Sequence, residues 1–330
     1  MSPVTAHSIV VTEHGGPEVM QLQHVELPPP PPGSVTVQHA AVGINLADTY
    51  FRSGLYPGRT PHGLGVEGAG TIIDIGDNVE GFAIGDRVTY TGSPLGAYSS
   101  VRNMPVDSLI HLPDAIAFDV AAASTMRGLT ATYLLNSVWH LSAGDTVLIQ
   151  AAAGGVGLIF CQMAKAMGLT VIGTVGNSSK VALATDAGCA HVLNSKTDDV
   201  AALVRDFTNG RGAQMVVDGV GGATFDASLA SVARRGLLVC LGTASGPVAP
   251  FDPPRLLRQG SVYVTRPAMA DYIADPEEKA RLVNSLFTHL ANGTVTVSIN
   301  QRWKLEDAVL AHQALESGST TGSSIFEFTS

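Results

Sequence analysis

The amino-acid sequence predicts an α/β protein in which a doubly wound parallel sheet interrupts a mostly β unit. Three observations predict this fold class. A glycine-rich turn at 150–157 follows an apolar run and leads directly into a helical pattern. Strand and helix patterns then alternate as far as residue 242, which is typical of βα units around a parallel sheet. Before residue 121, short segments of period two are separated by closely spaced glycines.

The first third of the chain is predicted to be a compact β unit. Val35–Ala40 alternates with period two, and Thr71–Ile75 and Arg87–Thr91 are strand-like. Glycines are dense over 63–70, and glycine–aspartate pairs mark the turns that follow. We therefore expect several short strands here rather than helices.

The middle of the chain carries the repeated βα pattern. A predicted helix at Ala121–Leu135 leads into it. The predicted strands are Thr146–Gln150, Thr170–Thr174, His191–Leu193, Met215–Asp218 and Gly236–Gly242. Predicted helices lie between them at Ser179–Ala187 and Asp198–Phe207, each followed by a glycine that ends it. This spacing implies parallel strands joined by helical crossovers.

The last part of the chain adds one helix and then returns to β character. Asp275 is a predicted N-cap, and Pro276 follows at the first helical position. The helix places three leucines on one face, and Thr294–Ile299 is then strand-like. The expected domains are a β-rich unit of residues 1–125 and 271–330 around a dinucleotide-binding unit of residues 126–270.

The turn after the first predicted parallel strand has the pattern Ala152-x-Gly154-x-x-Gly157, a dinucleotide fingerprint with alanine first. Gly154 and Gly155 let the backbone approach a pyrophosphate, and Gly157 lets the helix pack closely on its strand. The start of the helix, including Val156, offers N–H groups to the phosphates. The alternative is a tight β–α turn in some other α/β protein.

The second parallel strand indicates which cofactor is bound. It ends in Gly173-Thr174 and continues to Ser178-Ser179-Lys180, with no acidic residue before Asp186. NAD-binding folds place a carboxylate in this region, whereas a 2′-phosphate needs hydroxyls and a cation. NADPH is therefore favoured over NADH. The alternative is that Lys180 is an ordinary solvated lysine in the first turn of a helix.

A short polar cluster follows an apolar strand in the β unit. It contains Asn45, Asp48 and Tyr50, and it is weak evidence for a site by itself. Asp48 is equally suited to cap a helix, and Tyr50 to pack in an amphipathic core.

Composition excludes several classes of function. The 330 residues are 45% hydrophobic and carry a net charge of −9, which argues against nucleic acid or an anionic membrane as partner. The start of the chain does not resemble a signal peptide, and no apolar run is long enough to span a bilayer. A cytoplasmic protein is expected. The three cysteines form no C-x-x-C pair and are predicted to be small buried residues.

Several long motifs resemble one family. They include G-I-N-x-x-D-T-Y at Gly43–Tyr50, S-G-L-Y-P at Ser53–Pro57, A-A-A-G-G-V-G-L-I at Ala151–Ile159, and Y-V-T-R-P at Tyr263–Pro267. Over nearly its whole length the chain resembles the quinone oxidoreductase, or zeta-crystallin-like, branch of the medium-chain dehydrogenase/reductase superfamily. It looks especially like the bacterial NADPH:quinone reductases.

This resemblance implies a GroES-like catalytic domain split around a Rossmann domain, a cleft between them, and a homodimer. It makes Asn45, Asp48 and Tyr50 the candidate catalytic residues. With the residues argued above, the candidate cofactor-binding residues are Thr130, Gly154, Gly155, Val156, Gly157, Gly173, Thr174, Ser178, Ser179, Lys180, Gly242, Thr243, Ala244 and Arg266.

Three positions depart from the closest branch. Relatives often have tyrosine at Ser195, arginine at Gly318 and lysine at Arg127. The first two reach the adenosine phosphate in those relatives, so Lys180 is left as the clearest partner for a 2′-phosphate.

No bound metal is expected. Zinc-dependent members of the superfamily have a cysteine ligand where this chain has Ile44-Asn45, and a histidine ligand where it has Val66.

The expected function is therefore zinc-independent, NADPH-dependent reduction of a small quinone or another electron-poor acceptor. Two alternatives remain, namely reduction of the activated alkene of an enone and non-catalytic NADPH binding of the crystallin type.

Overall fold

The computed structural model describes residues 4–328 and divides the chain into two compact units. The β-rich unit contains Met1–Met126 and Val297–Ser330, and the nucleotide-binding unit contains Arg127–Thr296. The first division falls inside helix α2 (Phe118–Asn136). The second lies at 296/297 rather than at 270/271, because helix α9 (Pro276–Ala291) belongs with α2. Its Leu286 packs so closely on Gly128 of α2 that a Cβ there would collide with it.

The nucleotide-binding unit is built on six parallel strands in the order β11-β10-β9-β12-β13-β14. In chain order they are β9 Thr146–Ile149, β10 Thr170–Val175, β11 His191–Asn194, β12 Ala213–Asp218, β13 Val232–Cys240 and β14 Tyr263–Thr265. The predicted strands are therefore correct to within a few residues. The strands are buried apolar runs, as expected for a parallel sheet covered on both faces, and Leu148, Ile172, Val216 and Leu238 form the centre of the core.

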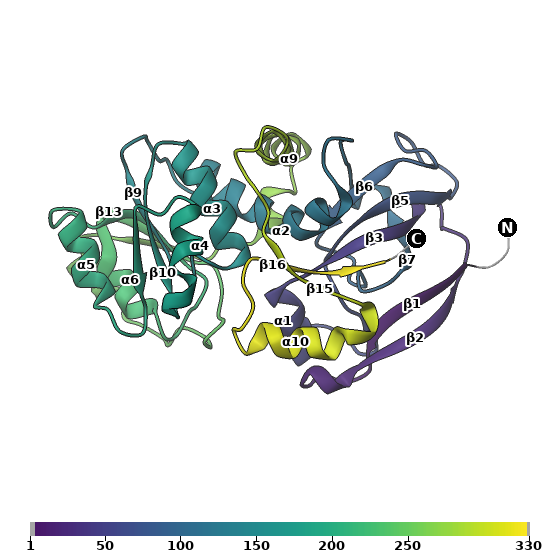
Figure 1. The fold of residues 1–330 in the computed structure, drawn as a ribbon, viewed down its shortest axis with the longest axis horizontal. Helices are drawn as coiled ribbons and strands as arrows, with labels where there is room; N and C mark the ends of the chain where they lie inside the picture. The colour runs from purple at the N-terminus through teal and green to yellow at the C-terminus, as the bar shows by residue number, and fades with distance from the viewer. Residues whose placement is uncertain (1–3, 329–330) are drawn as a thin grey trace. The chain divides into compact units, whose positions relative to one another are not determined.

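Helices cover both faces of this sheet (Figure 1), with α3 beside α4 on one side and α5 beside α6 on the other. The helices of the unit after α2 are α3 Gly155–Ala166, α4 Val181–Asp186, α5 Val200–Phe207, α6 Phe225–Ser231, α7 Pro254–Arg258, α8 Met269–Tyr272 and α9. The start of α9 is as predicted, since the Asp275 side chain accepts a hydrogen bond from the N–H of Glu278 and Pro276 is the first helical residue. The α/β fold class is confirmed.

The β-rich unit contains two sheets. One has the order β2-β1-β4, and the larger has the order β15-β16-β3-β5-β6-β8, with β7 also paired to β3. The strands are β1 Val4–Val11, β2 Met20–Leu27, β3 Ser34–Ile44, β4 His62–Gly63, β5 Glu67–Ile75, β6 Arg87–Thr91, β7 Val101–Pro105, β8 Leu109–His111, β15 Ile299–Trp303 and β16 Ser323–Glu327. Two α-helices pack on this unit's strands, α1 Leu46–Ser53 and α10 Ala308–Glu316. The C-terminal strand β16 pairs with β3, so the end of the chain completes the first unit as expected.

The prediction of a strand at Thr294–Ile299 was wrong for most of its length, because β15 begins only at Ile299. The backbone N–H and carbonyl of Thr296 are both hydrogen-bonded to the side chain of Gln162, at 2.8 and 3.1 Å, so a side chain takes the place of a neighbouring strand. The alternating Thr and Val residues favour an extended backbone there, but no ladder forms.

The cysteines were predicted to be buried. Cys161 and Cys189 are buried with their sulfur atoms 3.4 Å apart, and the neighbouring Cys189 thiol and burial raise the pKa of Cys161. Cys240 is only partly buried. Across residues 4–328, no helix has the length and apolar character needed to cross a membrane.

Candidate functional site

The polar cluster of the β-rich unit lies at a strand-to-helix junction. Strand β3 ends at Ile44, Asn45 is the N-cap residue of α1, and Asp48 lies in the first turn. The Asp48 carboxylate is fully buried and accepts a hydrogen bond from the backbone N–H of Asn45 at 2.7 Å. This is the acidic half of a capping box, which fixes where the helix begins. The alternative of a helix cap is therefore correct for Asp48, whose side chain lies beneath the junction.

The side chain of Asn45 is held by a residue that the sequence analysis did not single out. Its Nδ2 donates to Oε2 of Glu67 at 2.9 Å, and Oε1 of Glu67 accepts from the backbone N–H of Met126. Glu67 begins β5 and is fully buried. A Cβ on Gly43 would collide with Glu67, so the glycine allows this close packing. The sequence signal was Gly65-Val66-Glu67, which was used only to note that a zinc-ligating histidine was missing.

Tyr50 contributes the phenolic hydroxyl of the cluster. Its ring packs edge-on against Tyr56 with centroids 5.2 Å apart. Its phenolic oxygen is buried and has no hydrogen-bond partner among residues 4–328. Buried polar groups are nearly always hydrogen-bonded, so an unpartnered hydroxyl points to a bound group that would complete it.

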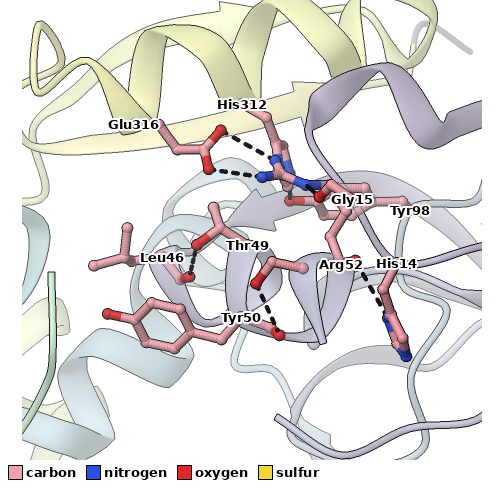
Figure 2. A network of polar contacts seen from close by, with 10 residues as sticks. His14, Gly15, Leu46, Thr49, Tyr50, Arg52, Tyr98, His312 and Glu316 are labelled. Carbon is pink, nitrogen blue, oxygen red and sulfur yellow. Dashed lines mark hydrogen bonds and ion pairs between the residues drawn. The ribbon is translucent and has the colours of Figure 1, made fainter. Parts of the chain in front are cut away.

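A chain of polar contacts lies behind Asp48 and leads to helix α10. Tyr98 Oη donates to Asp48 Oδ2 at 2.8 Å and lies 3.0 Å from Nε2 of His312. Arg52 NH1 lies 2.8 Å from Nδ1 of His312, and the same guanidinium pairs with Glu316 at 2.6 Å. Figure 2 shows the side chain of Arg52, at the end of α1, directed toward His312 and Glu316 of α10. Burial, and secondarily the charge of Arg52, lower the pKa of His312 to about 3.

The fingerprint turn of the nucleotide-binding unit lies between β9 and α3. Gly154 is the N-cap, and Gly155, Val156 and Gly157 form the first turn, whose N–H groups have no carbonyl within the helix to bond. A Cβ on Gly157 would lie 2.6 Å from the carbonyl oxygens of both Ala151 and Ala152, whereas one on Gly154 would meet only Ala151 O, at 3.2 Å. Gly157 is thus needed for packing, while Gly154 is less crowded, with a single backbone atom close to its Cβ position.

Thr174 and Gly173 support this turn from the neighbouring strand β10. The buried Thr174 hydroxyl donates to Gln150 Oε1 at 2.6 Å and accepts from the N–H of Ala151 at 3.3 Å. A Cβ on Gly173 would lie 2.6 Å from the Ala152 Cβ. Both residues therefore hold the turn in place from within, and Thr174 has no free hydroxyl hydrogen to offer a ligand.

The predicted 2′-phosphate segment follows β10 directly. Ser178, Ser179 and Lys180 form a short 3₁₀ helix, in which the Asn177 side chain accepts from the N–H of Ser179 at 3.0 Å. The two serines are exposed and Lys180 is partly buried. Because β10 pairs with β9 in parallel, this segment and the fingerprint turn lie at the same edge of the sheet.

Another predicted loop, Gly242-Thr243-Ala244, follows β13 at that edge. A Cβ on Gly242 would lie 2.6 Å from the Gly219 carbonyl, so the loops after β12 and β13 pack backbone to backbone. The hydroxyl of Thr243 is buried without a partner among residues 4–328. Arg266 is exposed just after β14, and Thr130 lies nearly buried on α2.

A buried aspartate that sequence reasoning missed organises the loop after β12. Asp218 ends the strand, and its carboxylate is almost fully buried. It accepts hydrogen bonds from Val220 N at 2.9 Å, Gly221 N at 3.0 Å, Thr224 Oγ1 at 2.8 Å and Ser228 Oγ at 2.6 Å. The only sequence signal was an acidic residue at the end of a predicted strand.

No metal-binding cluster is found in either unit among residues 4–328. No three His, Cys, Asp or Glu side chains among residues 4–328 are placed so that they could hold an ion. At the positions of the zinc ligands, Val66 is a buried apolar residue and the amide nitrogen of Asn45 donates to Glu67.

Known proteins resemble the chain across both units. The family described as alcohol dehydrogenase GroES-like domain matches residues 31–114, and the family described as zinc-binding dehydrogenase matches residues 155–300. The quinone oxidoreductase of Salmonella typhimurium is 47% identical over 318 residues, which cover 95% of this chain and 97% of that protein. The 2-haloacrylate reductase of a Burkholderia species is 36% identical over 324 residues, covering 95% and 96% of the two chains.

A solved structure of Escherichia coli quinone oxidoreductase complexed with NADPH matches with a TM-score of 0.95 and 43% identity, covering 98% of this chain and all of that one. Sequence identity at this level over nearly full length, together with the GroES-like and parallel-sheet architecture, identifies the family. The chain belongs to the quinone oxidoreductase branch of the medium-chain dehydrogenase/reductase superfamily.

Proposed function

We propose that this protein reduces quinones with NADPH and without a metal ion. The observation that carries the proposal is the buried hydroxyl of Tyr50, which has no hydrogen-bond partner among residues 4–328. Tyr50 lies on the short helix α1, whose N-cap residue Asn45 is held by Glu67. A quinone that gains electrons develops negative charge on its oxygen, and a preorganised O–H donor stabilises that charge. The names of the relatives support the same substrate class.

The nucleotide-binding unit fits a dinucleotide by its shape. The turn at Gly154–Gly157 offers N–H groups and room for a pyrophosphate, and the unpartnered Thr243 hydroxyl suits the nicotinamide half. When bound, NADPH supplies the hydride, or electrons singly, and the protein supplies binding and orientation. The residues of this chain therefore hold the cofactor, orient the acceptor and donate one hydrogen bond to it.

Turnover with a simple quinone, followed by the loss of NADPH absorbance, tests this function. Tyr50→Phe removes the proposed donor and is expected to lower kcat on the order of tenfold to a hundredfold. Tyr90→Phe is a matched control, because Tyr90 is a buried tyrosine of the same unit whose hydroxyl is already bonded to His39 at 2.7 Å. Equal kcat values for Tyr50→Phe and the parent would contradict the proposed role of Tyr50.

Cofactor preference is assigned to the segment Ser178–Lys180. Lys180→Ala is expected to weaken NADPH binding by about 1.5–3 kcal/mol, or roughly ten- to a hundredfold, because a charge-assisted contact to the 2′-phosphate is lost. NADH lacks that phosphate, so its affinity should hardly change. Fluorescence titrations with both cofactors measure the difference, and equal losses would rule out this assignment.

A second candidate function is reduction of an activated alkene. It is favoured by the 36% identity to a 2-haloacrylate reductase, whose named substrate is an electron-poor alkene. A panel of quinones and enones at matched concentration separates the two activities by kcat/KM. NADPH binding without turnover of any acceptor would instead indicate a non-catalytic, crystallin-like role.

The family resemblance also supports a homodimer in the cytoplasm as part of this proposal. Light scattering of the purified protein measures its mass, and cell fractionation gives its compartment. A monomer, or recovery with the membrane fraction, would contradict these two points.

A further inference from the structure

The β-rich unit contains two buried histidine–tyrosine pairs whose hydrogen bonds run in opposite directions. In the first pair, Nδ1 of His39 lies 2.6 Å from the carbonyl oxygen of Ser99 and must donate to it. Nε2 of His39 therefore accepts, and the Tyr90 hydroxyl donates to it at 2.7 Å. Burial lowers the pKa of His39 to about 4, which agrees with a neutral ring. This pair ends at a backbone carbonyl.

The second pair is set by Arg52. A guanidinium only donates, so Nδ1 of His312, 2.8 Å from Arg52 NH1, must accept. The ring proton then lies on Nε2, which donates to the hydroxyl of Tyr98 at 3.0 Å. The hydrogen of Tyr98 is left for Asp48 Oδ2, at 2.8 Å. The lowered pKa of His312 keeps its ring neutral at physiological pH.

The result is a one-way chain of hydrogen bonds that ends at the helix cap of α1. Asp48 Oδ2 accepts both from Tyr98 and from the backbone N–H of Asn45. Arg52 lies at the other end of α1 and is held by Glu316 of α10. Helix α10 contacts the end of α1 directly through Arg52, as Figure 2 shows. It also reaches the start of α1 indirectly, because His312 is bonded to Tyr98 and Tyr98 donates to Asp48.

We propose that Tyr98 and His312 are positioning residues for quinone reduction, which hold Asp48 so that Asn45 caps α1 and the helix presents Asn45 and Tyr50 to the acceptor. The inference rests on the proposed function in taking Asn45 and Tyr50 as acceptor-binding groups. Tyr98 acts through Asp48 and His312 acts through Tyr98, while His312 also accepts a hydrogen bond from Arg52.

Tyr98→Phe is the central variant, because it keeps the ring and removes the donor to Asp48. We expect kcat for quinone to fall roughly tenfold and KM for quinone to rise, since small displacements of reacting groups are costly. The Kd for NADPH should stay unchanged. Tyr90→Phe is the matched control and should lose similar thermal stability while keeping the kcat of the parent.

Two substitutions of His312 test the direction of the chain. In His312→Gln the amide nitrogen can take the place of Nε2 and still donate to Tyr98. In His312→Asn the shorter side chain reaches only the position of Nδ1, so the hydrogen bond to Tyr98 is lost. We expect the Gln variant to keep most of kcat and the Asn variant to lose it. The double variant Tyr98→Phe/His312→Asn should have the kcat of Tyr98→Phe alone, because His312 acts through Tyr98.

Amide hydrogen exchange of residues 46–53 gives a readout that does not need a substrate. Tyr98→Phe should speed exchange in the first turn of α1, and Tyr90→Phe should not. If the parent binds NADPH but turns over no quinone, the proposed function fails and this exchange result still decides the positioning role. Equal effects of Tyr98→Phe and Tyr90→Phe on kcat, or equal exchange in α1, would overturn the inference.

Discussion

Two buried aspartates, one in each unit, show how differently the two candidate sites are built. Both Asp48 and Asp218 accept backbone N–H groups where a strand ends. The Asp218 carboxylate accepts hydrogen bonds from Val220, Gly221, Thr224 and Ser228, which all lie within the ten residues that follow it. The Asp48 carboxylate instead accepts a hydrogen bond from Tyr98. Tyr98 is in turn bonded to His312, which lies 214 residues after Tyr98 in the chain.

The two candidate sites therefore depend on different parts of the chain for their structure. The Asp218 loop forms from one contiguous segment, and it supports the loop of Thr243 through Ser245, whose hydroxyl donates to the Val220 carbonyl at 2.8 Å. The Asp48 chain is complete only when α10, near the C-terminus, is packed against α1. Contacts within one segment therefore shape the loop after β12, and contacts between distant segments shape the junction that carries Asn45 and Tyr50.

The largest effect is expected where backbone packs on backbone. Gly157→Val would place a side chain within 2.6 Å of two carbonyl oxygens that cannot rotate away. We expect a loss of about 3 kcal/mol or more in the free energy of unfolding, at the upper end for overpacking, together with loss of NADPH binding. Thermal melts and NADPH titrations measure both.

Gly154→Ala is the control for this variant. Its Cβ would meet only the Ala151 carbonyl, at 3.2 Å, and the φ of −82° suits any residue. Stability should change by no more than about 0.5 kcal/mol while NADPH affinity falls. Equal stability losses for the two variants would contradict the different roles of these glycines.

The next effect separates the aspartates themselves. In the parent, the donors to Asp218 share two carboxylate oxygens, whereas Asp218→Asn leaves them a single amide oxygen. The substitution should lower the free energy of unfolding by about 1–3 kcal/mol. Because the loops after β12 and β13 pack on each other, NADPH affinity should fall as well. Hydrogen exchange in residues 46–53 should stay at the level of the parent. Faster exchange there would show that the two networks are not independent.

The sequence predicted the nucleotide-binding unit well because its signals are contiguous. An apolar run, a glycine turn and a helical pattern stand side by side, and the predicted strand Thr146–Gln150 is one residue longer than β9. The cap at Asp275 could be predicted for the same reason. The failure at Thr294–Ile299 arose because local β propensity could not reveal that a side chain of α3, Gln162, bonds the backbone.

The candidate site was predictable only in part. The motif around Gly43–Tyr50 indicated Asn45, Asp48 and Tyr50, but not that Asp48 lies beneath the helix start. Tyr98 and His312 each stand alone in the sequence, without periodicity or a spacing that links them. Their roles depend on which distant side chains meet in the folded unit, and a pattern of neighbouring residues does not contain that information.

A smaller effect is expected on acidification, and it should come from the β-rich unit. An imidazole in the unfolded chain titrates near 6.5, whereas burial lowers the pKa of His39 to about 4 and that of His312 to about 3. Between the folded and unfolded pKa values, the unfolded chain binds more protons than the folded protein. The contribution of these histidines to the free energy of unfolding is therefore complete above pH 6.5 and decreases as the pH is lowered. Each histidine contributes a slope of up to about 1.4 kcal/mol per pH unit.

Urea unfolding at several pH values between about 7 and 5 measures this slope. His39→Gln and His312→Gln should each give a shallower slope than the parent, because one buried group that resists protonation is removed. A parent slope retained in both histidine variants would show that other groups carry the acid dependence.

The smallest effect is expected from metal removal. In the β-rich unit, Val66 and the pair Ile44-Asn45 stand where related dehydrogenases have zinc ligands. The apolar side chains of Val66 and Ile44 have no donor atom, and the amide nitrogen of Asn45 donates to Glu67 at 2.9 Å. Hydrogen bonds to Glu67 and Asp48 hold this junction. Prolonged chelation should leave quinone turnover and the melting temperature unchanged, and elemental analysis should find no stoichiometric zinc. Loss of activity that added zinc restores would show instead that the junction is organised by a metal, and the contrast drawn between the two aspartates would then lose its basis.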